Sequence, residues 1–252
     1  MTWQQQIWLI VVLSLILATP LALAEVTILN DDRATLELTI TSKFSLEAKT
    51  SSAHVSSSEA ELSWFPRETY NQDVEEIDTN PEADEHDEYY LFEWDNPAFG
   101  SHNIIVTTLL STNNDITPIS TKEQFPLPRI DADLLIYTQA SKMIDSNTQI
   151  RGLAGNLAAS KDNQYEVVFA LADWVTTNID YELSSITAEA NYPSSWVLEQ
   201  GYGVCDEMTN LFISLNRALG IPSRFVSGLA YTNMEELPTN WGAHGWAEVW
   251  FP

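Results

Sequence analysis

The alternation of apolar and polar residues predicts a β-rich N-terminal half. Between Val26 and about Thr112, apolar and polar positions alternate in short runs. The clearest runs are residues 34–40, 54–64, 89–94 and 103–109. Turn-forming residues separate them, and alternation with a period of two predicts strands with one buried face. We therefore predict a β-sandwich-like domain over residues 25–112.

One acidic stretch, residues 73–88, does not follow this alternation. It contains Pro81 and His86 among its Asp and Glu residues. Because no spacing typical of metal ligands recurs in it, we predict a solvated loop and not a metal-binding loop.

The pattern changes after residue 112. Residues 113–128 are polar and carry several prolines, which predicts a linker. Beyond it, apolar residues recur at steps of three and four, which predicts helices over 131–145, 149–159 and 164–179. Strand-like alternation returns near the C-terminus, so we predict an α+β domain over residues 129–252.

The N-terminus is typical of an export signal. Residues 1–24 contain no charged side chain, residues 7–18 are almost entirely apolar, and Ala22-Leu23-Ala24 resembles a cleavage site. The apolar run is short for a membrane span, which needs about 20 residues. No Lys or Arg precedes it, so an uncleaved membrane anchor is the alternative. Both interpretations predict an extracytoplasmic protein, secreted or anchored at the outer face of the membrane.

The charge of the chain limits its partners. Asp and Glu number 36 against 11 Lys and Arg, which gives a formal net charge of −25. Nucleic acids and anionic membrane surfaces would repel such a chain, so we exclude both as main partners. The excess of acidic residues is typical of a highly soluble surface. Composition leaves the oligomeric state open.

The single cysteine, Cys205, is the first candidate for chemistry. An exported chain with one cysteine has no internal disulfide, so its thiol is a buried small side chain, a bond to another chain, or a reactive group. Apolar residues at steps of three and four predict a helix that begins near Cys205 and ends at Gly220. Free N–H groups at a helix start favour a thiolate. Asp206 and Glu207 oppose this effect, because their charges raise a thiol pKa.

The second candidate, His244, lies on a predicted strand over residues 243–251. Alternation puts His244, Trp246 and Glu248 on one face of this strand and small residues on the other. The small residues suit close packing by a helix. A histidine beside a thiol can accept its proton. The pattern alone leaves open which face meets Cys205.

Three blocks in this order carry a family resemblance. They are Gly203-Val204-Cys205, the segment RALGIPSR at residues 217–224, and the segment HGWAEV at residues 244–249. In these blocks, residues 160–252 resemble the transglutaminase-like superfamily, a branch of the papain-like cysteine enzymes. The resemblance implies that Cys205 is the nucleophile, that His244 is the general base and later the acid, and that the His244 face meets Cys205. It also implies a thioester intermediate, which an amine or water resolves.

The resemblance is incomplete at the third catalytic position. The family places an Asp or Asn that orients the histidine on the next strand, after residue 252. Glu248 cannot replace it, because four residues along a strand span about 13 Å. We expect Glu248 to pair within the fold, and we expect the chain to be a fragment or to lack the orienting acid. The Cys205 N–H is a predicted oxyanion donor. Trp196 and Gln200 lie upstream as candidates for a side-chain donor, with no motif to support either.

We therefore predict an exported, thiol-dependent acyl-transfer enzyme: a transglutaminase, amidase or peptidase acting on a protein or peptide. The alternative is a catalytically incompetent module that serves in cell-surface binding. We predict no metal, since Cys205 and His244 are only two ligands and His54, His86 and His102 fall in the N-terminal domain. The chemistry requires no cofactor, and cross-linking and hydrolysis both stay open.

Overall fold

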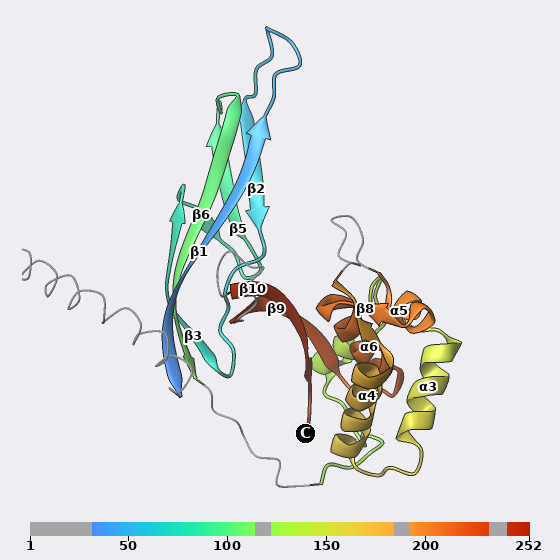
Figure 1. The fold of residues 1–252 in the computed structure, drawn as a ribbon. Coiled ribbons are helices and arrows are strands. Elements are labelled where there is room, and N and C mark those ends of the chain that lie inside the picture. Colours follow the sequence, from blue (N-terminus) through green and yellow to red (C-terminus); the bar gives the residue numbers. More distant parts are fainter. Residues whose placement is uncertain (1–31, 114–121, 184–191, 232–240) are drawn as a thin grey trace, which may run out of the picture. The chain divides into compact units, whose positions relative to one another are not determined.

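A computed structural model of the chain describes residues 32–113, 122–183, 192–231 and 241–252 (Figure 1). The chain divides into two compact units, Met1–Pro118 and Ile119–Pro252, which we treat separately. The predicted export signal over residues 1–24 lies outside the described residues. Within the four described ranges, no helix combines the length and apolar character needed to cross a membrane.

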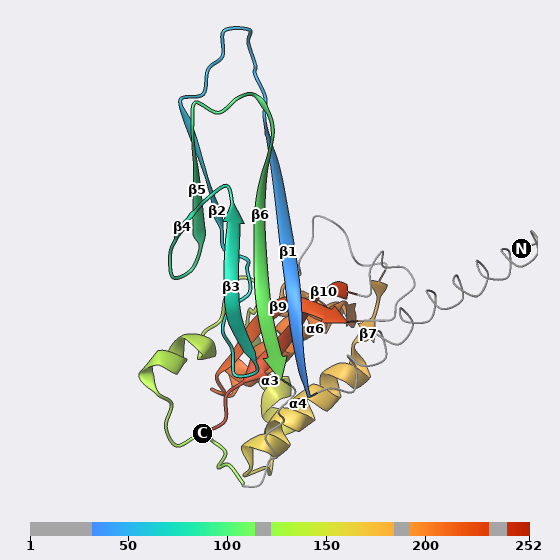
Figure 2. The ribbon, with the colours of Figure 1, turned by 90° about the vertical axis from the view of Figure 1, so that its left-hand side faces the viewer.

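The N-terminal unit consists of two antiparallel three-stranded sheets (Figure 2). The first sheet has the strand order β1 (Arg33–Leu46), β6 (Gly100–Asn113), β3 (Gln72–Asn80). The second has the order β2 (Ser57–Leu62), β5 (Tyr90–Asp95), β4 (Asp84–Glu85). The longest pairing joins β1 to β6 along their whole length, from Arg33 opposite Asn113 to Leu46 opposite Gly100. The prediction of antiparallel strands in this half is confirmed.

One apolar cluster contains side chains from both sheets. Phe92 of β5 and Val106 of β6 are fully buried in it, and Ile40, Leu62 and Ile77 pack against them. Exposed and half-buried residues alternate strictly along β1, as its sequence predicts. Burial of the apolar face therefore holds these strands together.

The prediction of a solvated loop over residues 73–88 is wrong. Most of this stretch forms β3, at the edge of its sheet, and the short strand β4. Val74 and Ile77 are half-buried, whereas the acidic side chains of β3 are exposed. A β-bulge between Val74 and Glu76 accommodates the extra residue. An edge strand needs only one apolar face, so an acidic sequence with few apolar residues can form it.

The C-terminal unit is mixed α+β. Its elements are the 3₁₀ helix η1 (Ala132–Thr138), the helices α3 (Thr148–Ala158), α4 (Gln164–Asn178), α5 (Ser194–Gln200) and α6 (Cys205–Ala218), and the strands β7 (Asp180–Tyr181), β8 (Tyr202–Gly203), β9 (Ser223–Tyr231) and β10 (Trp241–Val249). Strands β7 and β8 pair in parallel, and β9 and β10 pair antiparallel. The helices predicted over 149–159, over 164–179 and after Cys205 are confirmed.

Residues 131–145 differ from the predicted helix. Only η1 forms there, and none of its side chains is buried. Leu135 and Ile136 remain 47% and 67% exposed. A helix gains most of its stability from packing an apolar face, and η1 buries none of its side chains.

Helix α6 lies at the centre of the second core. Its Leu211 and Leu215 are fully buried together with Val167 and Leu171 of α4. This confirms the predicted apolar stripes of both helices. Gly220, with φ +75°, follows α6 and ends it, because the left-handed conformation suits glycine.

The described part of the predicted linker, residues 122–128, belongs to the second unit and packs within it. The Phe125 N–H donates to the Asp162 carbonyl at 2.9 Å, and Lys122 and Asp162 form an ion pair at 2.6 Å. Phe125 and Leu127 pack against the core. A proline-rich segment without helix or strand periodicity can still bury individual side chains, which its sequence pattern does not reveal.

Candidate active site

Cys205 is the first residue of α6, and the preceding residues explain why the helix begins there. The Val204 N–H donates to the Glu207 carboxylate at 3.1 Å, which closes the first turn. Gly203 leaves room for this contact, because a Cβ at Gly203 would lie 2.6 Å from the Glu207 Cβ. Glu207 is buried and bonded to the helix start. It therefore stabilises the local fold that presents Cys205.

The surroundings of the Cys205 thiol favour its protonated form. Burial is the largest influence and raises the pKa of Cys205 above its usual value. A hydrogen bond with the Gly245 backbone lowers this pKa, and the Asp206 carboxylate raises it. The Asp206 Oδ1 lies 3.5 Å from the Cys205 Sγ. Burial and Asp206 thus outweigh the favourable field of the helix start, and the thiol needs a base to become a nucleophile.

Strand β10 packs against α6 at Gly245. A Cβ on Gly245 would lie 2.3 Å from the Asp206 Oδ1 and 2.4 Å from the Phe225 Cζ. The Thr209 hydroxyl of α6 also donates to the Gly245 carbonyl at 3.3 Å. Close helix packing on the small-residue face of this strand is therefore confirmed.

His244 precedes Gly245 on β10 and pairs with Gly228 of β9. Its side chain is exposed, and its ring centroid lies 6.2 Å from that of Trp246. The Trp246 ring covers Gly228, where a Cβ would lie 2.6 Å from the Trp246 Cη2. On β10, the Gly245 face packs against Asp206 of α6, whereas the resemblance implied that the His244 face meets Cys205. A catalytic Cys205–His244 pair stays a prediction.

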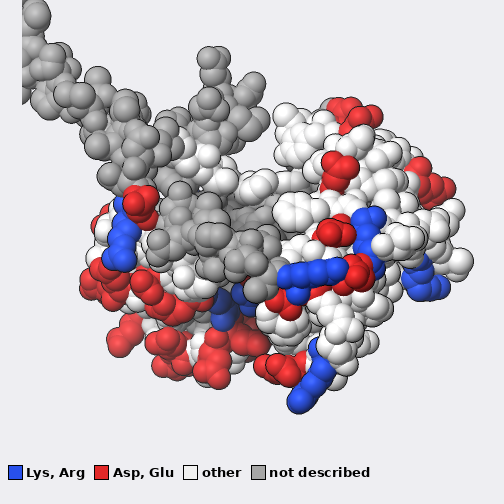
Figure 3. Space-filling view, turned by 90° about the horizontal axis from the view of Figure 1, so that it is seen from below, with Lys and Arg blue, Asp and Glu red and all other residues white. Residues whose placement is uncertain are grey.

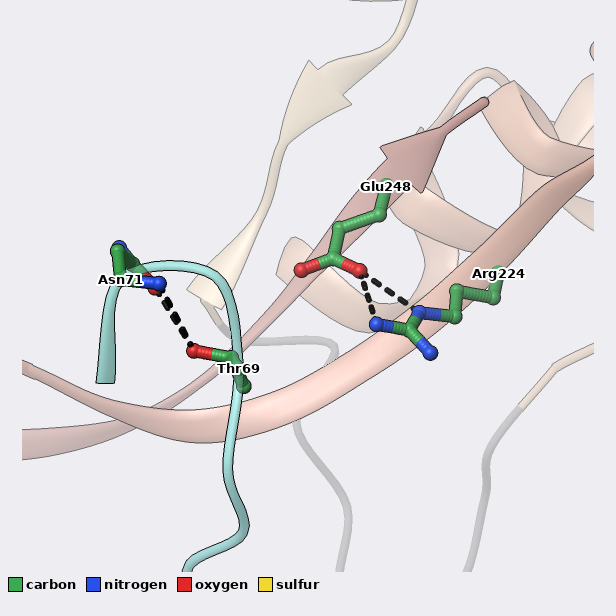
Figure 4. Close-up of polar contacts among 4 residues, drawn as sticks. All are labelled: Thr69, Asn71, Arg224 and Glu248. Carbon is green, nitrogen blue, oxygen red and sulfur yellow. Dashed lines mark hydrogen bonds and ion pairs between the residues drawn. The ribbon is translucent and has the colours of Figure 1, made fainter. Parts of the chain in front are cut away.

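Glu248 has the structural role that the sequence predicts. Its Oε2 lies 2.6 Å from Nη2 and 2.7 Å from Nε of Arg224, directly opposite on β9 (Figure 4). The hydrogen bond with Glu248 is the largest influence on Arg224 and raises its pKa. Glu248 therefore pairs across the sheet.

Residues 151–252 match the family model of the transglutaminase-like superfamily. This part of the chain is a transglutaminase-like superfamily domain. The match includes both Cys205 and His244.

Two relatives share part of this domain. The uncharacterized protein YebA of Bacillus subtilis (strain 168) is 32% identical over 117 residues, which cover 41% of this chain and 16% of YebA. An uncharacterized protein of Mycobacterium leprae (strain TN) is 28% identical over 109 residues, which cover 41% of this chain and 37% of that protein. The match therefore spans well under half the length of either relative.

A solved structure shares the fold. It is a protein from Cytophaga hutchinsonii, provisionally assigned as a cysteine protease, with a TM-score of 0.60 and 17% sequence identity. The similarity covers 87% of this chain and 73% of that one. At this identity, the comparison shows a shared fold alone.

In the described part of the transglutaminase-like domain, neither upstream residue suggested as an oxyanion donor forms a hydrogen bond with Cys205. The Trp196 ring stacks on Tyr192 at 3.9 Å between centroids and meets Tyr202 edge-on at 5.3 Å. Gln200 is exposed at the last position of α5. The aromatic cluster therefore holds Trp196 as a packing residue.

Sequence analysis did not assign Tyr181 to this site. Burial, followed by the neighbouring Cys205 thiol, raises the pKa of Tyr181. Strand β7 places Tyr181 opposite Gly203 of β8, two residues before Cys205. In the sequence, Trp174-Val175, Asn178-Ile179 and Tyr181 also resemble the segment that precedes the cysteine in the superfamily, and this is the signal that points to Tyr181.

Acidic side chains outnumber basic ones on one described face of the protein. Figure 3 shows Asp and Glu spread over one face with fewer Lys and Arg between them. Within the described ranges, no three His, Cys, Asp or Glu side chains are grouped to hold a metal ion.

Proposed function

We propose that the transglutaminase-like domain is a thiol-dependent acyl-transfer enzyme that acts on a carboxamide or peptide bond of a protein or peptide. The observation that carries this proposal is the position of Cys205. It starts α6 and meets the β10 backbone at Gly245, next to His244. Membership of the superfamily supports the same roles.

The chemistry follows from these groups. His244 takes the proton from the Cys205 Sγ, and the thiolate forms an S–C bond with the substrate carbonyl. The carbonyl electron pair moves to the oxygen, which the Cys205 N–H stabilises. Collapse breaks the C–N bond, the leaving amine takes the proton from His244, and a thioester remains. An amine or water then attacks the thioester, so transglutaminase, amidase and peptidase activity all use the same residues.

Trapping of the acyl-enzyme tests this function. We expect p-nitrophenyl acetate, an activated acyl donor, to add one acetyl group to the protein, visible by intact-mass spectrometry. Hydroxylamine should remove this group, since it cleaves thioesters. Cys205→Ala should remain unmodified at the same site.

A contrary result would be equally informative. If iodoacetamide alkylates Cys205 while neither p-nitrophenyl acetate nor a glutamine-containing peptide acylates it, the enzyme proposal fails. A catalytically incompetent module for cell-surface binding would then replace it.

We also propose that the protein is exported and that its two N-terminal sheets form a β-sandwich. Residues 1–24 support export, and the apolar cluster common to both sheets supports the sandwich. Sequencing the N-terminus of the protein from its natural host tests export: a start at Glu25 indicates cleavage, and a start at Met1 indicates an anchor. Recovery from the cytoplasm would contradict both, and an experimental structure tests the sandwich.

A further inference from the structure

A cavity in the C-terminal unit lies apart from the candidate active site. It has a volume of about 220 Å³ and is lined by the end of η1, the start of α3 with the segment before it, and the second half of α6. Ser214 is the α6 lining residue nearest in sequence to Cys205, and at 1.5 Å per residue the two are about 13 Å apart along the helix. The proposed acyl transfer therefore does not use this cavity.

Two guanidinium groups give the cavity its chemical character. Arg151 of α3 and Arg217 of α6 both line it, and its described lining contains no Asp or Glu. This is unusual for a chain with 36 acidic and 11 basic residues. Ser146 adds a hydroxyl group to the lining. The cavity is thus a positively charged site within a strongly acidic protein.

Neutral groups hold both arginines in place. The Nε and Nη2 of Arg217 donate to the Ser223 carbonyl at 3.0 and 2.7 Å, and its Nη1 donates to the Gln139 carbonyl at 2.6 Å. The Nη1 of Arg151 donates to the Ser146 carbonyl at 3.2 Å. In the described part of the chain, neither arginine forms an ion pair with Asp or Glu. The backbone therefore positions Arg217 without neutralising its charge.

Arg217 retains the capacity to bind an anion. A guanidinium group has five N–H donors, so the three bonds described for Arg217 leave one N–H on each of its Nη atoms. Burial is the largest influence on this side chain and lowers its pKa, because the charged group has lost hydration. An anion in the cavity would compensate this loss. Carboxylate and phosphate groups are the anions that match the geometry of a guanidinium group.

We propose that this cavity binds a small oxyanion, a carboxylate or phosphate group, to which Arg151 and Arg217 donate hydrogen bonds. Ile144 and Ala218 form an apolar part of the wall, against which the carbon atoms of an organic acid can pack. A water molecule takes about 30 Å³ of liquid, so the cavity has room for a small organic acid as well as for a single phosphate ion. This binding does not depend on the proposed acyl transfer.

Isothermal titration calorimetry of the full chain with sodium citrate and with sodium phosphate tests the proposal. The ionic strength is held constant with NaCl, which separates a specific site from general screening. We expect saturable binding of at least one of the two anions at one site per chain. Citrate alone would identify a carboxylate ligand, and phosphate alone would identify a phosphate ligand. Arg151→Gln should raise the Kd about tenfold, because it removes a charge-assisted hydrogen bond.

Arg129→Gln is the matched control. It also removes one exposed positive charge from the C-terminal unit, but Arg129 does not line the cavity. It should bind the anion with the Kd of the parent protein. Equal weakening in Arg129→Gln and Arg151→Gln would show general attraction of anions and overturn the site. An unchanged Kd in Arg151→Gln, or no saturable binding of either anion by the parent protein, would overturn it as well.

Discussion

His244→Ala is expected to slow acylation of Cys205 by about 10²- to 10⁴-fold at neutral pH. The reason is electrostatic: burial and Asp206 raise the pKa of the Cys205 thiol, so little thiolate exists without a base. His244 is exposed near the middle of β10, and removing its ring leaves the contacts between Gly245 and α6 in place. The measurement is the single-turnover acylation rate with p-nitrophenyl acetate.

The pH dependence of alkylation separates a loss of the base from a loss of folding. In the parent protein, labelling of Cys205 by iodoacetamide should persist below the ordinary thiol pKa of about 8.5, because His244 accepts the proton. In His244→Ala, labelling should follow the isolated thiol, whose pKa is raised, and should therefore need a higher pH. Identical profiles in both proteins would show that no Cys–His pair forms.

Asp206→Asn is a control that should change the alkylation rate of Cys205 in the opposite direction to His244→Ala. The Asp206 carboxylate lies 3.5 Å from the Cys205 Sγ and raises the thiol pKa. Asparagine has the same size but no charge, so it keeps the packing against Gly245. We expect the pKa of the thiol to fall, so that alkylation below this pKa accelerates. A slower rate would show that Asp206 assists the nucleophile.

Gly245→Ala is expected to destabilise the C-terminal unit and to disturb Cys205 at the same time. The added Cβ would lie 2.3 Å from the Asp206 Oδ1 and 2.4 Å from the Phe225 Cζ, so these side chains or β10 itself must shift. Such overpacking costs about 1–3 kcal/mol of unfolding free energy. The shift should also weaken the Gly245 hydrogen bond that lowers the Cys205 pKa. Urea unfolding and the alkylation profile measure the two effects.

Gly155→Ala is the matched glycine control. Gly155 lies on the exposed side of α3, and no atom lies within 4 Å of an added Cβ. Because alanine restricts the unfolded chain and favours a helix, we expect stabilisation by about 0.4–1 kcal/mol. If Gly245→Ala matches the parent in both urea midpoint and labelling, close packing of β10 on α6 does not support the site.

The sequence by itself determined the elements that carry the candidate chemistry. Apolar residues at helical spacing predicted α6 and its start at Cys205, and alternation predicted β10 with small residues facing the helix. These predictions rest on local periodicity, which each segment carries within its own residues. The three ordered blocks also predicted the superfamily that the family match shows.

Only the tertiary structure decided features that depend on distant partners. The acidic strand β3 exists because β6 pairs with it, and residues 132–138 form only η1 because none of their side chains is buried. Tyr181 lies near Cys205 because β7 pairs with β8, and burial with Asp206 sets the sign of the Cys205 pKa shift. Strand pairing and desolvation depend on residues far apart in the chain, so a local sequence pattern cannot predict these effects.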